Sequence, residues 1–410
     1  MPVAPVPRTD SSWPIRASDL RGLSRLGVDA TLGLTGLVEA MHHTIASGAG
    51  IVGGSPAGRT SGITGAVYGS VRTVTRGVGR GLDALLGAIE PPRSSDAASP
   101  EREALIAAVN GVWGDHLVAS GNPLAIPMAL RTGGRALDLS GASLAGQIAD
   151  PGPRLLVLAH GLCMSDLQWT RQGHDHGQAL ARDLGFTPLY LHYNSGRHVS
   201  ENGREFAALL ERLTAQWPVP LRELVIVGHS MGGLVARSAC QHAGDARHAW
   251  IALLRKLVFL GTPHHGAPLE RGGRLVDGTL GLSPYVRPFA RLGKTRSAGI
   301  TDLRYGNLRD ADWQGRDRHA QRRDDRVPTP LPRGVQSCLL AATLAERPGR
   351  LHRTVIGDGL VPLASALGEH RDAALRLTVP ASRRHIVAGC GHLDLLSHAE
   401  VYTTLRAWLA

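Results

Sequence analysis

The stretch Glu223-Leu-Val-Ile-Val-Gly-His-Ser-Met-Gly-Gly-Leu-Val-Ala-Arg237 contains the pattern that decides the fold of this 410-residue chain. After Glu223, residues 224–227 form an apolar run that predicts a buried strand, and the stretch from 233 to 242 predicts a helix. Between them, residues 228–232 read G-x-S-x-G. A strand, this pattern and then a helix are typical of a sharp turn that exposes a serine hydroxyl above a sheet. The flanking residues are glycines because larger side chains would collide with neighbouring elements there. We predict Ser230, exposed on this turn, as a nucleophile.

Short apolar runs alternate with helical stretches on both sides of this turn. The predicted strands lie at 155–160, 187–193, 224–228, 256–261 and 338–344, and the predicted helices lie near 178–184, 205–217 and 233–242. Buried strands that alternate with helices predict an α/β fold, with a mostly parallel central sheet and helices on both faces. We assign residues 122–410 to this domain. Residues 267–334 interrupt the alternation and predict an inserted cap over the sheet edge.

The first 121 residues predict a helical N-terminal extension. Apolar residues recur at steps of three and four from 23 to 45 and from 63 to 89, which is the pattern of two amphipathic helices. A Pro/Ser-rich linker at 91–99 precedes a third predicted helix. Marginal helices need a partner for their apolar faces. We expect them to pack against the catalytic domain near the cap, and contact with an anionic lipid surface is the alternative.

The net charge of +11 and the isoelectric point near 10.3 make this chain strongly basic. Arg72, Arg76 and Arg80 flank the second apolar row at steps of four, and basic faces favour anionic lipid. No zinc-finger or RNP-like pattern accompanies the charge, so we expect no nucleic-acid partner. The N-terminus lacks the apolar core of a signal peptide, and no apolar run is long enough for a membrane span. The expected location is cytoplasmic, with peripheral membrane association as an option.

A nucleophilic serine needs a base and an acid that orients the base. Asp358 lies on a turn between two glycines after a predicted strand, and His392 follows a strand and a Gly turn. The chain order of Ser230, Asp358 and His392 is the order of the α/β-hydrolase triad. The weaker competitors are His385, His398, Asp372 and Asp302.

Backbone amides must stabilise the oxyanion that forms during acyl transfer. One candidate donor is the amide of Met231, directly after the nucleophile. The other is the amide of Leu162, in the loop His160-Gly161-Leu162 that follows the strand at 155–160. We interpret His160 as an anchor of this loop rather than as a base.

These residues together resemble the serine lipases and esterases of the α/β-hydrolase fold. The closest resemblance is to the bacterial lipase group that includes the GPI-inositol-deacylase-like hydrolases. The motifs that carry it are HGL at 160–162, YNSGRHVSENG at 193–203, GHSMGG at 228–233, LGTPHHGAP at 260–268, GDGLVP at 357–362 and GHLDLL at 391–396. The resemblance spans 122–410. It implies a triad of Ser230, Asp358 and His392, with the amides of Leu162 and Met231 as oxyanion donors.

No cofactor or metal is expected. Secreted bacterial lipases hold a structural calcium through a residue two positions after the catalytic histidine, where this chain has Asp394, but a helix-capping role is the preferred interpretation. His264 and His265 lack a cysteine or carboxylate at ligand spacing. Cys163 and Cys390 are expected near the pocket as free thiols.

The expected function is hydrolysis of carboxylic esters with a hydrophobic acyl group, through an acyl-enzyme. An acyltransferase with the same triad is one alternative. A protein that binds lipid surfaces or partners through its N-terminal helices is the other. The pattern leaves the substrate and the oligomeric state open.

Overall fold

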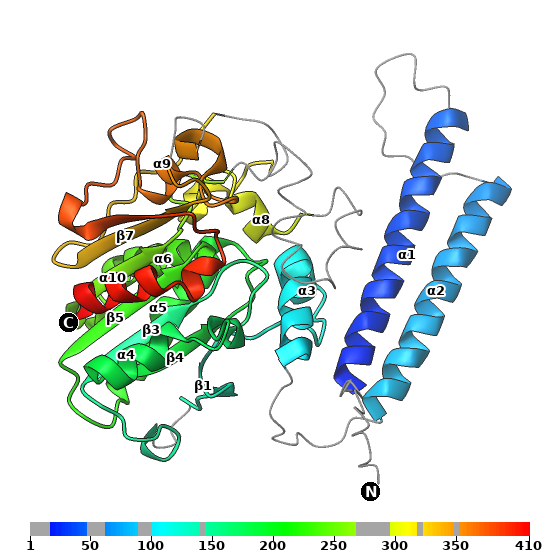
Figure 1. The fold of residues 1–410 in the computed structure, drawn as a ribbon. Helices are drawn as coiled ribbons and strands as arrows, with labels where there is room; N and C mark the ends of the chain where they lie inside the picture. Colours follow the sequence, from blue (N-terminus) through cyan, green and yellow to red (C-terminus); the bar gives the residue numbers. More distant parts are fainter. Residues whose placement is uncertain are drawn as a thin grey trace, which may run out of the picture. The chain divides into compact units, whose positions relative to one another are not determined.

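The computed structural model describes residues 17–46, 62–88, 100–139, 144–267, 296–317, 323–347 and 352–410 (Figure 1). Two compact units make up the chain. One comprises residues up to 96 together with 120–124, and the other comprises 97–119 together with 125–410. The predicted linker at 91–99 and much of the predicted cap, at 268–295 and 318–322, lie outside the described residues.

The larger unit is built on one eight-stranded sheet with the order β2-β1-β4-β3-β5-β6-β7-β8. Strands β3 to β8 run parallel, whereas β1 pairs antiparallel with both β2 and β4. The strands are β1 (Ala129–Thr132), β2 (Arg135–Ala136), β3 (Arg154–Ala159), β4 (Thr187–His192), β5 (Glu223–His229), β6 (Leu254–Leu260), β7 (Gln336–Thr343) and β8 (Arg384–Ala388). Because β5 lies in the middle of the parallel part, the turn after it opens at the centre of one sheet edge.

Helices cover both faces of this sheet (Figure 1). They are α3 (Pro100–Ala119), α4 (His176–Leu184), α5 (Val199–Ala215), α6 (Met231–Ala246), α8 (Ala298–Asp302), α9 (Leu363–Ala366) and α10 (Ala399–Leu409). Successive side chains of β3 point to opposite faces, so Leu155 and Val157 join one core cluster and Leu156 and Leu158 join another. Residues of α5 and α6 complete the first cluster, and residues of α4 and α10 complete the second.

This arrangement confirms the predicted α/β-hydrolase fold with a mostly parallel sheet. The apolar runs predicted as strands correspond to β3, β4, β5, β6 and β7, and the predicted helices correspond to α4, α5 and α6. The short edge strands β1 and β2 and the C-terminal helix α10 were not predicted.

The smaller unit contains the helices α1 (Ala17–Ala46) and α2 (Gly62–Ala88), which lie antiparallel and are called the helical hairpin below. Gly79 allows the close approach of the two helices, because a Cβ there would lie 2.7 Å from Cγ2 of Val28. Near one end, Asp83 accepts hydrogen bonds from Arg21 at 2.7 Å and from Arg25 at 2.5 Å. None of the described helices is long and apolar enough to cross a membrane.

Helix α3 belongs to the larger unit, although the sequence analysis grouped it with the extension. Its residues Ala108 and Val112 join the core cluster that contains α5 and α6. The domain boundary at residue 121 and the packing of the hairpin against the larger unit stay predictions.

On the hairpin, α2 presents an apolar row to solvent. The row consists of Val71, Val74, Val78 and Leu82, whose exposed fractions are 42, 64, 63 and 40%. Helix α1 therefore does not cover this face of α2.

Candidate active site

Ser230 stands on the turn between β5 and α6 with a strained backbone. Its φ of 54° and ψ of −126° lie outside the regions that side-chain-bearing residues commonly adopt. The backbone amide of Ser230 donates to the carbonyl of Leu260 in the neighbouring strand at 2.8 Å, which holds the turn against the sheet.

The glycines of the turn are sterically required. A Cβ on Gly228 would lie 2.5 Å from Cα of Gly233, and a Cβ on Gly232 would lie 2.2 Å from the carbonyl oxygen of Ala159. Real Cβ atoms do not approach other heavy atoms this closely. The structure thus gives the physical reason for the G-x-S-x-G spacing around Ser230.

His392 lies in the loop after β8 and contacts Asp358 in two ways. Its Nδ1 is 2.7 Å from Oδ2 of Asp358, and its backbone amide donates to the carbonyl of Asp358 at 3.0 Å. The side chains of both residues are buried, with exposed fractions of 6 and 0%. The structure therefore holds the imidazole at one angle through side chain and backbone together.

Asp358 is fixed by the turn that carries it. Its Oδ1 accepts hydrogen bonds from the amides of Leu360 at 3.0 Å and Val361 at 2.8 Å, which leaves Oδ2 for His392. Gly357 has a φ of 52°, and a Cβ there would lie 1.8 Å from the carbonyl oxygen of Val361, so the turn needs glycine at that position. The segment before Asp358 was predicted as a strand, but 352–356 is a π-helical turn. The carbonyl of Gly357 still accepts from the amide of Leu344, directly after β7, which keeps the turn beside the sheet edge.

The two candidate oxyanion donors lie next to Ser230. Met231 is the first residue of α6, where an amide has no acceptor within the helix. Leu162 lies in the loop after β3 and lines the same cavity as Ser230. A Cβ on Gly161 would lie 3.0 Å from Cβ of Ser230, so this loop approaches Ser230 closely.

Ser230 and His392 line one small cavity of about 20 Å³. The rest of its lining is mostly apolar, and includes Leu162, Met164, Pro263, Ala267, Leu303, Leu360, Val361 and Leu393. Such a volume holds about one water molecule. An acyl chain requires these walls to move apart.

The loop after β3 is anchored by His160. This imidazole is fully buried and stacks on Tyr193 with ring centroids 4.4 Å apart, while the Tyr193 hydroxyl donates to the His160 carbonyl at 2.8 Å. Burial lowers the pKa of His160 to about 3, so the ring is neutral at ordinary pH.

The competing histidines and acids have other partners. His385 contacts Glu400 with its Nε2 at 2.7 Å and is partly exposed, whereas His398 caps α10. Asp302 accepts from the amide of Val199 at 2.8 Å and lies 3.0 Å from Nδ1 of His198. Asp372 accepts from the amide of Ala374 in an exposed turn.

The sequence pattern does not indicate a role for His229, the residue before Ser230. Its Nε2 is 3.1 Å from the carbonyl oxygen of His392, and burial holds its pKa well below the usual 6.5. A neutral imidazole donates through one nitrogen only, so Nε2–H donates to that carbonyl. His229 thereby joins the turn that carries Ser230 to the loop that carries His392.

One group of side chains in the described part of the chain has metal-ligating chemistry. The group consists of Glu103 of α3, Asp166 in the segment after β3, and His192 at the end of β4. All three are buried, and their potential ligand atoms lie close to one another. Arg131 of β1 already contacts both acids, with Nη1 2.8 Å from Glu103 and 3.1 Å from Asp166. Its guanidinium supplies positive charge at this point, so the group reads as an ion-pair network.

The remaining residues singled out from the sequence take part in local contacts. Asp394 accepts from the amide of Gly391 at 3.2 Å and lies 3.4 Å from Arg171. His264 and His265 contact the guanidiniums of Arg237 and Arg326, each with an Nη atom 3.2 Å from Nδ1.

All four cysteines are free and buried. Burial raises the pKa of both Cys163 and Cys390 to about 12, so both thiols are protonated at ordinary pH. Neither is poised as a thiolate nucleophile.

Residues 157–314 match the family model described as PGAP1-like alpha/beta domain. The match includes Leu162, Ser230 and Met231 and ends before Asp358 and His392. It confirms the resemblance that the motifs predict. No curated protein matches the chain.

Several solved structures are similar to the chain at low identity. The lipase BlEst2 of Bacillus licheniformis, in its mature form, is 19% identical over 64% of this chain and 94% of its own, with a TM-score of 0.42. YbtT, the type II thioesterase of the yersiniabactin NRPS/PKS pathway, is 16% identical over 63% of this chain and 93% of its own, with a TM-score of 0.36. The esterase Pf2001 of Pyrococcus furiosus is 12% identical over 63% of this chain and 82% of its own, with a TM-score of 0.35.

Proposed function

We propose that this protein is a serine hydrolase that cleaves carboxylic esters through an acyl-enzyme. The observation that carries the proposal is the 2.7 Å contact between Asp358 and His392, whose imidazole lines the same cavity as Ser230. Nucleophile, base and acid are thus supplied by three loops at one edge of the sheet. No part of this chemistry needs a cofactor.

The proposed reaction starts with attack of Ser230 Oγ on the ester carbonyl while His392 accepts the hydroxyl proton. Asp358 stabilises the imidazolium and fixes the tautomer, because its Oδ2 accepts from Nδ1. The amides of Leu162 and Met231 donate to the oxyanion. His392 then protonates the leaving alcohol, and water repeats the sequence on the acyl-enzyme.

The apolar lining of the cavity supports a hydrophobic acyl group as substrate. Leu303, Leu360 and Leu393 offer no hydrogen bond to a polar chain. The same lining supports acyl transfer as a second candidate, because an apolar site that excludes water favours an alcohol as acceptor of the acyl group.

A series of p-nitrophenyl esters of increasing acyl length tests the proposal. We expect burst kinetics and turnover that rises from the acetyl ester to longer chains, with no turnover in the Ser230→Ala variant. Adding glycerol and analysing products by mass spectrometry separates hydrolysis from transfer. Equal turnover by wild type and Ser230→Ala would contradict the proposal.

We also propose that the helical hairpin makes peripheral contact with an anionic lipid surface through the apolar row Val71, Val74, Val78 and Leu82. Helix α1 leaves the row uncovered, and the net charge of +11 favours an anionic surface, which supports this contact. Packing of the row against the larger unit, the expectation from sequence, is the alternative.

Deletion of residues 1–98, which leaves α3 in place, tests this contact. We expect a monomeric enzyme that hydrolyses soluble esters at the full-length rate but no longer sediments with vesicles that contain phosphatidylglycerol. Aggregated or poorly folded protein would show instead that the hairpin covers apolar surface of the catalytic domain.

A further inference from the structure

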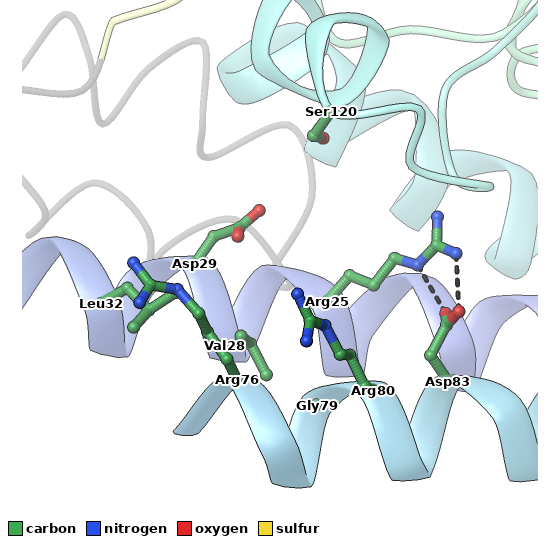
Figure 2. Close-up of a pocket in the computed structure, with 9 residues that line it drawn as sticks. All are labelled: Arg25, Val28, Asp29, Leu32, Arg76, Gly79, Arg80, Asp83 and Ser120. Atoms are coloured by element: carbon green, nitrogen blue, oxygen red, sulfur yellow. Dashed lines mark hydrogen bonds and ion pairs between the residues drawn. The ribbon is translucent and has the colours of Figure 1, made fainter. Parts of the chain in front are cut away.

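A groove in the helical hairpin gathers arginines without a matching number of acids. It has a volume of about 270 Å³ and is lined by Arg25, Val28, Asp29, Leu32, Arg76, Gly79, Arg80, Asp83 and Ser120. Figure 2 shows the side chains of Arg76 and Arg80 rising from α2 toward α1. We call this feature the arginine groove.

At one end of the groove, hydrogen bonds hold Arg25 in place, and Asp83 balances part of the positive charge. Arg25 donates to Asp83 through Nε and Nη2, at 2.5 and 2.8 Å (Figure 2). Its Nη1 also donates to the carbonyl of Gly121 at 2.9 Å. Arg21 shares the same carboxylate, and hydrogen bonds from Arg21 and Arg25 hold the pKa of Asp83 well below its usual value. Asp83 therefore stays ionised, and its acceptor capacity is used within the hairpin.

Arg76 and Arg80 differ from this pair. Within the described part of the chain, neither makes a hydrogen bond or an ion pair with a protein group, and both side chains are exposed in the groove. They lie one helical turn apart, so both side chains start from the same face of α2, with their Cα atoms about 6 Å apart along the helix axis.

The charges around the groove leave a positive surplus. The lining holds Arg25, Arg76 and Arg80 against Asp29 and Asp83, so its net charge is +1. Arg21 adds a further positive charge beside Asp83. The two arginines that have no protein partner among the described residues, Arg76 and Arg80, together carry the charge that balances a phosphate monoester. The planar forks of two neighbouring arginines suit the oxygens of such a group.

We propose that the arginine groove binds the phosphate group of an anionic ligand, with Arg76 and Arg80 as the residues that contact it. This site is separate from the candidate active site and does not depend on the proposed ester hydrolysis.

The position of the groove on α2 bears on the source of the phosphate. At 100° per residue, Arg76 and Arg80 lie roughly half a turn of the helix away from the apolar row at Val71, Val74 and Val78. A hairpin that sits on a bilayer through its apolar row therefore turns the groove toward water. This geometry favours a soluble phosphate ligand, and a lipid headgroup is the other source of the same chemistry.

The experiment uses the full-length chain and two kinds of probe. Isothermal titration calorimetry measures binding of inorganic phosphate. Cosedimentation measures binding to phosphatidylcholine vesicles with and without phosphatidic acid. The test variant is Arg76→Gln with Arg80→Gln. The matched control, Arg255→Gln with Arg371→Gln, removes the same charge at two exposed positions of the larger unit.

We expect wild type and control to bind phosphate alike and the test variant to bind it about tenfold more weakly or worse. Binding to phosphatidic acid vesicles that depends on Arg76 and Arg80, without binding of inorganic phosphate, assigns the site to a lipid headgroup. Equal binding of both probes by test variant and wild type overturns the proposal, as does no binding of either probe by wild type.

Two further measurements separate a binding role from a structural one. Circular dichroism should show unchanged helix content in the test variant, because glutamine is a good helix former. The variant Arg76→Lys with Arg80→Lys, which keeps the charge but loses the forks, should bind phosphate with intermediate strength. Ester hydrolysis should be unchanged in all of these variants, so loss of phosphate binding says nothing against the proposed hydrolase.

Discussion

Glycine has different roles around Ser230 and along α2, where Gly79 packs against α1 but other glycines have open space around them. Around Ser230, each glycine lies where the backbone of another element leaves no room for a Cβ, at 2.2 Å for Gly232 and 2.5 Å for Gly228. In α2, Gly77 and Gly81 have nothing within 4 Å. The contrast teaches that a glycine-rich pattern indicates function only where secondary elements converge on it.

Burial follows the same division. The large apolar side chains of the sheet are fully buried between two layers of helices, whereas Val74 and Val78 of α2 are more than half exposed. Complete burial of one such side chain contributes about 1.5–3 kcal/mol to stability. Within the hairpin, the apolar row obtains little of this contribution and is available to another surface.

The largest expected effect separates His392 from His385 within the catalytic unit. His392→Ala should lower kcat by about 10⁴ or more, because the proposed base is lost, while the fold persists. Asp358→Asn should act similarly, since the imidazole loses its anionic partner. His385→Ala removes only a partly exposed contact with Glu400 and should leave kcat near wild type. Hydrolysis of p-nitrophenyl esters checks all three, and loss of activity only in His385→Ala would show that the triad is wrong.

The free energy of unfolding should also depend on pH differently in the two units. Burial holds the pKa of His160 at about 3 and the pKa values of His229 and His264 well below 6.5. Below about pH 6.5 these histidines become protonated in the unfolded chain but stay neutral in the folded chain. Each such histidine therefore lowers the free energy of unfolding by up to about 1.4 kcal/mol per pH unit of acidification. In the folded hairpin, by contrast, the pKa of Asp83 is lowered. The stabilisation that ionised Asp83 provides is therefore complete above its unfolded pKa of 3.8 and is lost only as the pH falls below that value.

Urea unfolding followed by tryptophan fluorescence measures this difference, because Trp169 and Trp250 are buried in the catalytic unit. The fluorescence transition should move to lower urea between about pH 7 and about pH 5. The helical signal of the hairpin should not move over that interval. A fluorescence midpoint independent of pH would contradict the assignment of neutral buried histidines.

A pair of glycine substitutions gives the smallest but most direct comparison. Gly232→Ala should destabilise the catalytic unit by about 1–3 kcal/mol and impair turnover, because the new methyl group meets the carbonyl of Ala159. Gly77→Ala should stabilise the hairpin by about 0.5–1 kcal/mol, because an open helical position gains helix propensity. Denaturant titrations of both variants check the signs, and stabilisation by Gly232→Ala would refute the steric account of the turn.

The sheet and the candidate triad were largely predictable from sequence, for a physical reason. Strands buried on both faces are continuous apolar runs, and the proposed catalytic serine lies at the end of one of them, as Ser230 follows β5. Edge strands of two to four residues, such as β2 at Arg135–Ala136, are too short and too exposed to produce a pattern. Helix α10 was missed because Val401, Thr403 and Thr404 weaken its helical signal.

Contacts between distant segments were not predictable. The network of Glu103, Asp166 and His192 joins α3 to a residue after β3 and to the last residue of β4, and no local spacing in the sequence indicates it. The π-helical turn before Asp358 was read as a strand because Val355 and Ile356 are β-branched. Likewise, the role of His229 depends on a carbonyl 163 positions away.

The central claim is that Ser230 is the nucleophile of an ester hydrolase, and covalent labelling tests it most directly. A fluorophosphonate probe should modify the folded full-length chain once, and peptide mass spectrometry should place the adduct on Ser230. The Ser230→Ala variant should not be labelled, and His392→Ala should be labelled far more slowly because its serine lacks a base. An adduct on another serine, or unchanged labelling of Ser230→Ala, would contradict the account.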